Sequence, residues 1–121
     1  MQTILAIAAG GALGAVLRHG VNSLFAGPFP WGIMLCNVAG SFAMGVLIAL
    51  FANVWDVPPA VKAFMTVGLL GGFTTFSTFS MDAVLLWERG AIAQAAFYTL
   101  GSVTLSIAGL VAGLMMVRTL T

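Results

Sequence analysis

The sequence predicts an all-α membrane protein with four transmembrane helices, because its composition is strongly apolar and four long apolar stretches follow one another. Of its 121 residues, 61% are hydrophobic and 6% are charged, whereas soluble domains carry about 25% charged residues. A domain of this size exposes too much surface to hide such an apolar excess in a core. The chain must therefore use lipid as its solvent.

Each predicted helix reaches the roughly 20 residues that a helix needs to cross the hydrocarbon layer. The first stretch, Thr3 to Leu17, lacks the basic leading region of a signal peptide, so we interpret it as a retained span. The separators are short and carry proline or glycine, so we expect residues 1–121 to form one domain with nothing folded outside the membrane. The approximate helices are residues 3–25, 31–54, 60–87 and 91–117.

The ends and faces of these helices carry two further signals. Tryptophan stands at three predicted helix ends, where indoles anchor at the depth of the lipid headgroups. Small residues repeat at four-residue spacing, which predicts close helix packing but no substrate. The tryptophans are Trp31, Trp55 and Trp87, and the small pairs are Gly10 and Gly14, Ser41 and Gly45, Gly68 and Gly72, and Gly109 and Gly113.

Several classes of function are disfavoured. A formal net charge of +1 provides no basic surface for nucleic acid. The single cysteine, Cys36, cannot form an intramolecular disulfide or a multi-cysteine metal site, and we interpret it as an apolar wall residue. His19 is the only histidine, and the loops are too short for a catalytic pocket. We therefore expect no enzyme.

The basic residues divide evenly between the two predicted faces of the membrane. Lys62 and Arg118 lie on the side of the termini, and Arg18 and Arg89 lie on the opposite side, so the positive-inside rule sets no orientation. A chain that inserts both ways forms its simplest symmetric assembly as an antiparallel, dual-topology homodimer with a two-fold axis in the membrane plane. A chance balance among so few charges is the alternative.

The third predicted helix contains a run from Gly71 to Ser80 that should interrupt it at mid-membrane. Two adjacent glycines and five hydroxyl residues weaken a helix, and freed backbone groups at that depth must face protein or a polar cavity. Two such breaks on a two-fold axis would gather carbonyl oxygens around a hard cation such as sodium. Alternatively, the hydroxyls bond back to their own helix and leave it intact.

Two further features suit the passage of an anion. Phe76 and Phe79 share a helical face, and the positive edge of a phenyl ring can face an anion without trapping it. Asn37, the only amide in the middle of a span, offers two N–H donors. Packing of the rings and an interhelical bond of the amide are the alternative interpretations.

The fourth helix places hydroxyls at four-residue steps, at Tyr98, Ser102 and Ser106. A track of neutral donors can pass an anion along without the fixed charge that would hold it too tightly. Serines at a close helix interface would show the same spacing.

With these residues, the chain resembles the Fluc (CrcB-type) fluoride channels of microbes over nearly its whole length. The residues that carry the resemblance are Gly14, Arg18, Trp31, Gly32, Asn37, Gly40, the run from Gly71 to Ser80, Tyr98, Ser102 and Ser106. The resemblance implies an antiparallel dimer with two pores. It also implies a structural sodium ion at the dimer interface, held by the main-chain carbonyls of Gly71 and Thr74 of both subunits.

The resemblance further implies passive export of fluoride from the cytoplasm, which relieves fluoride toxicity. It places the protein in the cell membrane, the inner membrane of a Gram-negative cell. The implied fluoride path is lined by Asn37, Phe76 and Phe79, and we add the hydroxyls of Ser77, Thr78, Tyr98, Ser102 and Ser106.

Three positions leave questions open. Ile33 stands where many members have threonine, which puts the details of ion access in doubt. Asp82 stands where glutamate is common, and it receives no site role here. Arg18 resembles a family arginine near a pore entrance, although a snorkelling interfacial arginine fits equally well.

Two other functions remain. A small multidrug exporter also has four short helices and dual topology, but it depends on a membrane-embedded carboxylate for proton coupling, and the first helix has none. A structural subunit of a larger membrane complex would explain the packing glycines but not the grouping of phenylalanine, asparagine and hydroxyls. Capture of a partner protein would favour that last interpretation.

Overall fold

The computed structural model describes all residues, 1–121, and contains four membrane-spanning stretches and no strand. The first, second and fourth spans are single helices, and the third span is made of four consecutive pieces. The elements are α1 (Gln2–Ser23), α2 (Trp31–Asn53), α3 (Pro59–Ala63), the π-helical η1 (Phe64–Leu70), α4 (Gly71–Phe73), α5 (Phe76–Glu88) and α6 (Ile92–Leu120). The prediction of an all-helical, four-span membrane protein is confirmed.

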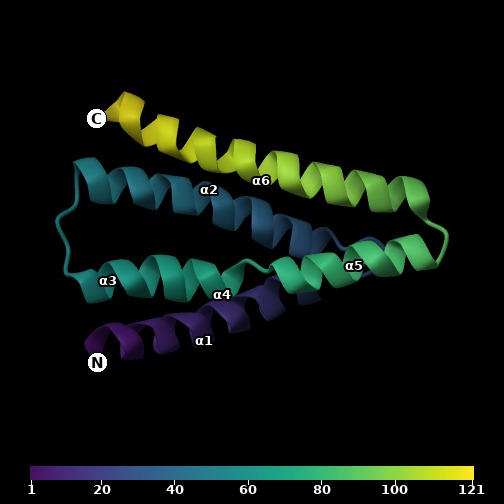
Figure 1. Ribbon diagram of the computed structural model, residues 1–121, viewed down its shortest axis with the longest axis horizontal. Helices are drawn as coiled ribbons and strands as arrows, with labels where there is room; N and C mark the ends of the chain where they lie inside the picture. The colour runs from purple at the N-terminus through teal and green to yellow at the C-terminus, as the bar shows by residue number, and fades with distance from the viewer.

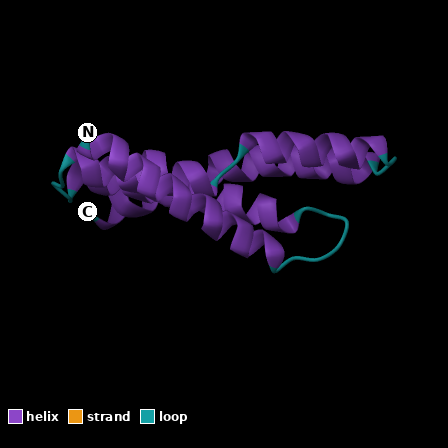
Figure 2. Cartoon of the chain, turned by 90° about the horizontal axis from the view of Figure 1, so that it is seen from below, coloured by secondary structure: helices purple, strands orange, loops and turns teal.

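The spans form an elongated bundle with both termini at one end (Figure 1). The most extensive pairings join α2 to α6 and α1 to the first half of the third span. At the end away from the termini, the loop between α1 and α2 is the longest connection (Figure 2). Its Phe29 ring meets Tyr98 of α6, and its Pro28 carbonyl accepts from Arg89 at the end of α5. All three tryptophans lie at helix ends, as predicted, and all are exposed.

Two seams of glycine bring the helix backbones into direct contact. A methyl group on Gly10 or Gly14 of α1 would overlap the backbone of the third span, at Phe64 and Leu69 respectively. A methyl group on Gly113 of α6 would overlap the carbonyl of Phe42 on α2. The predicted close packing is therefore confirmed for these pairs of helices, and it fixes α1 against the third span ahead of the interruption.

The third span is interrupted at mid-length. Thr74 and Thr75 are extended, with φ −87° and ψ 156° at Thr74 and φ −153° and ψ 124° at Thr75. The Thr74 hydroxyl donates back to the carbonyl of Leu70 at 2.9 Å, and the Thr75 hydroxyl accepts from the N–H of Thr78 at 3.1 Å. The hydroxyls thus cap two helix ends instead of supporting one continuous helix, which confirms the predicted break.

Little of the chain is hidden from its surroundings. Only 18 of the 121 residues are buried, and the largest buried cluster lies between α2, α5 and α6 around Phe79, Leu86 and Tyr98. Most large apolar side chains point outward, as expected of a protein whose solvent is lipid. The described fold is that of a multi-pass membrane protein.

The glycine seam can be tested by Gly14→Ala, with Gly11→Ala as its control. A methyl group at Gly14 meets the backbone at Leu69 and Phe73, whereas one at Gly11 meets nothing within 4 Å. We expect Gly14→Ala to lower the free energy of unfolding by about 1–3 kcal/mol, the usual cost of overpacking, and Gly11→Ala to leave it unchanged. Thermal unfolding in detergent measures both, and equal melting temperatures would contradict the seam.

Candidate functional site

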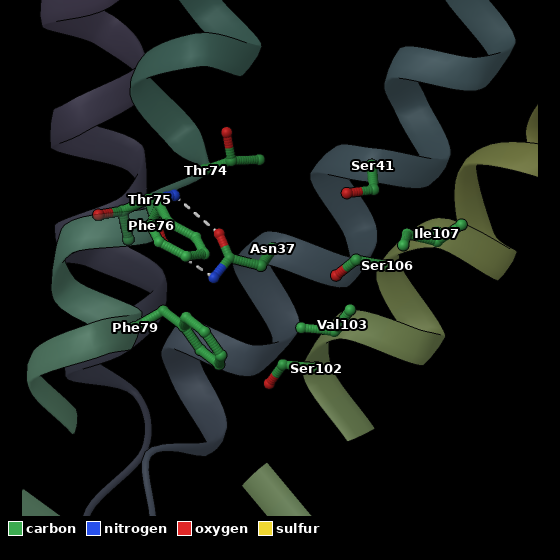
Figure 3. Close-up of a pocket in the computed structure, with 10 residues that line it drawn as sticks. All are labelled: Asn37, Ser41, Thr74, Thr75, Phe76, Phe79, Ser102, Val103, Ser106 and Ile107. Carbon is green, nitrogen blue, oxygen red and sulfur yellow. Dashed lines mark hydrogen bonds between the residues drawn. The ribbon is translucent and has the colours of Figure 1, made fainter. Parts of the chain in front are cut away.

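A cavity of about 240 Å³ opens beside the break in the third span. Side chains from α2, α5 and α6 converge on it, together with the two extended threonines (Figure 3). No charged residue lines it. The lining residues are Asn37, Ser41, Thr74, Thr75, Phe76, Phe79, Ser102, Val103, Ser106 and Ile107.

Asn37 of α2 clamps the interrupted backbone. Its Nδ2 donates to the carbonyl of Thr75 at 3.0 Å, and its Oδ1 accepts from the N–H of the same residue at 2.7 Å (Figure 3). One amide thereby satisfies both backbone groups of a residue that has left the helix. Because the amide nitrogen carries two hydrogens, one N–H is left without a partner in the chain, at a residue that lines the cavity.

Aromatic rings form a line from the break toward the loop between α1 and α2. Phe76 and Phe79 are 5.6 Å apart between ring centroids and Phe79 and Tyr98 are 5.2 Å apart, both pairs tilted. Phe79 is buried, whereas the Phe76 ring is 77% exposed. Phe29 of the loop meets Tyr98 edge-on at 5.6 Å. The two predicted phenylalanines therefore lie together, but only Phe76 reaches out of the bundle.

The three hydroxyls of α6 have different surroundings. The Ser102 side chain is 3% exposed, and its hydroxyl has no hydrogen-bond partner. Ser106, one turn further, also lines the cavity. Tyr98 is fully buried and donates its hydroxyl to the Asp82 carboxylate at 3.2 Å, so its proton is already in use and it does not line the cavity.

Ser102 is the unusual member of this set. A buried hydroxyl that makes no hydrogen bond costs about 1–3 kcal/mol, and native proteins leave few such groups without a reason. The chain itself supplies no partner for this hydroxyl, at a residue that lines the cavity.

Arg18, Ser77 and Thr78 lie at the break but outside the cavity lining. Arg18 donates through Nε to the carbonyl of Gly72 at 3.1 Å and through Nη1 to the hydroxyl of Thr78 at 3.3 Å. Ser77 is exposed, and its hydroxyl lies 3.4 Å from that of Thr75. Arg18 therefore contacts the third span on both sides of its break.

The carbonyls at the break fall into two groups. Those of Gly72 and Thr75 accept hydrogen bonds from Arg18 and Asn37. Those of Gly71 and Thr74 accept none within the chain. No group of three histidine, cysteine, aspartate or glutamate side chains is placed to hold a metal ion.

Sequence reasoning missed part of the lining. Ser41 was read only as a packing residue, although it lies one helical turn after Asn37 and so shares its face. Thr75 was covered only as one of the hydroxyl residues of the run from Gly71 to Ser80. Val103 and Ile107 are apolar residues of an apolar helix, so nothing in their types marks them. Ile33, whose effect on ion access was left open, is buried in the cluster that contains Phe79 and Tyr98.

Comparison with known proteins gives a consistent family. Residues 5–114 match the model of the CrcB-like protein family, Camphor Resistance (CrcB). A protein of Rhodospirillum centenum named "Fluoride-specific ion channel FluC" is 54% identical over 123 residues, covering 98% of each chain. A protein of the same name from Nitrobacter winogradskyi is 52% identical, over 95% of this chain and 94% of its own. Another from Methylobacterium nodulans is 53% identical, over 98% of each chain.

The clamp at Thr75 can be tested by Asn37→Ala, with Asn53→Ala on the same helix as its control. Asn37→Ala strips Thr75 of both partners, so we expect the free energy of unfolding to fall by about 1–3 kcal/mol. Asn53 is exposed at the end of α2, and its replacement should change nothing. Thermal unfolding in detergent provides the measurement, and a stable Asn37→Ala variant would refute the clamp.

Proposed function

The chain belongs to the CrcB-like family, and from that membership we propose that it is a passive, fluoride-selective ion channel that exports cytoplasmic fluoride and relieves fluoride toxicity. The observation that supports this most directly is the buried, unpartnered hydroxyl of Ser102 in an uncharged cavity at mid-span. Fluoride is a small anion that accepts strong hydrogen bonds and fits such a donor.

The cavity can replace the water that fluoride must shed. The free N–H of Asn37, the hydroxyl of Ser102 and the ring edge of Phe76 supply positive partial charge from three helices. Because an ion in a low-dielectric site is very costly without such partners, several donors are needed at once. Since none of them carries a full charge, the ion can also leave, as conduction requires.

The broken helix adds a fixed field. The N-terminus of α5 begins at Phe76, beside the cavity, and the N-terminal end of a helix carries positive partial charge. Interrupted helices in membrane transporters use their N-terminal ends for anions and their freed carbonyls for cations. The membrane potential, negative inside, would then drive fluoride outward with roughly 2.3 kcal/mol per 100 mV, so no energy source is required.

We propose further that two copies assemble as an antiparallel, dual-topology homodimer with two pores. The cavity is open on one side, next to the exposed Phe76 ring, and a second copy packed there would close it. The weak bias of the basic residues is compatible with insertion in both orientations. The symmetric interface would then lie along the third span.

A structural sodium ion fits this assembly. The carbonyls of Gly71 and Thr74 are free of hydrogen bonds, and oxygen ligands suit a hard cation. Bound there, the ion would neutralise the carbonyl dipoles of both subunits. Arg18 and Asn37 bind the neighbouring carbonyls, those of Gly72 and Thr75, so only the two proposed sodium ligands are left free.

Fluoride efflux from proteoliposomes tests the proposed function. We expect fast fluoride loss after addition of valinomycin, followed with a fluoride electrode, and negligible chloride loss in parallel vesicles. Folded protein that releases no fluoride would overturn the proposal.

The role of Ser102 is tested by Ser102→Ala, with Thr104→Ala as its control. Removing an unpartnered buried hydroxyl should leave the melting temperature unchanged or higher, while fluoride efflux should slow about tenfold for the loss of one donor to an anion. Thr104 lies exposed on the same helix, and its replacement should affect neither quantity. Unchanged efflux from Ser102→Ala would remove this serine from the path.

Exchange of sodium for a large organic cation tests the ion and the dimer together. We expect a dimer by light scattering in sodium, and a lower melting temperature or dissociation without it, since a ligand that binds only the native state stabilises it. A monomer in sodium would contradict the dimer, and identical melting curves in both salts would contradict the sodium site.

A further inference from the structure

Arg18 joins the two halves of the broken span. Its Nε binds the carbonyl of Gly72 at 3.1 Å, before the break, and its Nη1 lies 3.3 Å from the hydroxyl of Thr78, after it. The two partners belong to α4 and α5, which are otherwise linked only by the extended Thr74 and Thr75. One guanidinium group therefore spans the interruption.

The glycine seam explains why Arg18 reaches this place. Gly14 lies one turn before Arg18, and its backbone presses on Leu69, Gly72 and Phe73. With α1 held against α4 in this way, the next turn of α1 brings residue 18 level with the break. The position of the arginine follows from backbone contacts and not from attraction between opposite charges, because both of its partners are neutral oxygen atoms.

The chemistry of the contact is specific to arginine. Its planar guanidinium presents donors in a fixed fork and can bind two separate acceptors at once. A lysine at this position keeps the charge but carries one compact ammonium on a flexible stem, so it cannot hold both oxygens in the same geometry. Charge and geometry can therefore be separated by a single substitution.

The part of the chain held by this contact carries the exposed ring. Thr78 follows Phe76 by two residues, and Thr75, which Asn37 clamps from α2, precedes it by one. Since the Phe76 side chain is 77% exposed, packing within the chain fixes it only weakly. Its position depends on the backbone of residues 75–78, which Asn37 holds from one side and Arg18 from the other.

We infer that Arg18 is a positioning residue that sets ion selectivity by geometry, by fixing the start of α5 and with it the Phe76 ring at the edge of the cavity. This role differs from electrostatic attraction of anions at the pore entrance, which needs only the charge. This inference rests on the proposed fluoride channel. When the contact is lost, the distance between α4 and α5 can vary, and the narrow part of the path no longer rejects the larger chloride ion.

The test is the ratio of fluoride to chloride efflux from proteoliposomes containing Arg18→Lys. We expect this ratio to fall roughly tenfold relative to the unaltered protein, for the loss of one charge-assisted hydrogen bond. Arg89→Lys is the matched control, because Arg89 also donates to a backbone carbonyl, that of Pro28 at 2.6 Å, but is exposed at the other end of α5. Its ratio should not change.

Thr78 supplies an independent arm. Thr78→Val removes the acceptor and should lower the ratio of fluoride to chloride efflux, whereas Thr78→Ser keeps the hydroxyl and should preserve the ratio. The double variant, Arg18→Lys with Thr78→Val, should have a ratio no lower than that of the more affected single variant, because the two residues act through one contact. If Arg18→Lys does not fold, the two Thr78 variants decide alone, and equal ratios in both overturn the inference.

The possible outcomes are distinguishable. An unaltered protein that passes no fluoride refutes the proposed channel. An unaltered protein that is selective, with an Arg18→Lys variant of the same selectivity, leaves the channel standing and overturns the inference. Slower fluoride efflux in Arg18→Gln with unchanged selectivity in Arg18→Lys would assign the arginine to attraction by charge and likewise overturn it.

Discussion

The backbone at Thr74 and Thr75 leaves the helix at mid-span, where lipid offers its polar groups no hydrogen bond, and the rest of the structure answers that constraint. Each polar group freed at this depth must find a partner inside the protein or pay several kcal/mol. Asn37 satisfies both backbone groups of Thr75, and Arg18 satisfies the carbonyl of Gly72. The carbonyls of Gly71 and Thr74 and the Ser102 hydroxyl keep no partner within the chain.

The glycine seams serve the same constraint. The guanidinium of Arg18 reaches the break because Gly10 and Gly14 bring α1 into backbone contact with the third span. Gly40 lets α2, which carries Asn37, approach the Thr74 side chain closely. Small residues give membrane helices that approach, since lipid provides no hydrophobic force between them. Packing that carries no chemistry of its own therefore decides which polar groups meet at the site.

Composition and local sequence predicted the four spans and the interruption, because both depend on properties of contiguous residues: length, apolarity and the helix-breaking run from Gly71 to Ser80. The cavity was predicted in part, through Asn37, Phe76, Phe79, Ser102 and Ser106. The contact of Arg18 was not foreseen, because its partners lie 54 and 60 residues away along the chain. The use of the Tyr98 proton by Asp82 depends likewise on how α5 and α6 meet.

Both termini lie at the same end of the bundle (Figure 1), which follows from an even number of spans and limits how such a gene can be duplicated. Two copies fused directly, end to end, must share one orientation, because the second begins on the side where the first ends. A fusion that places the copies head to tail in opposite orientations needs an odd number of additional crossings between them. Whether the number of spans is even or odd thus determines which fusions of two copies can hold them in opposite orientations.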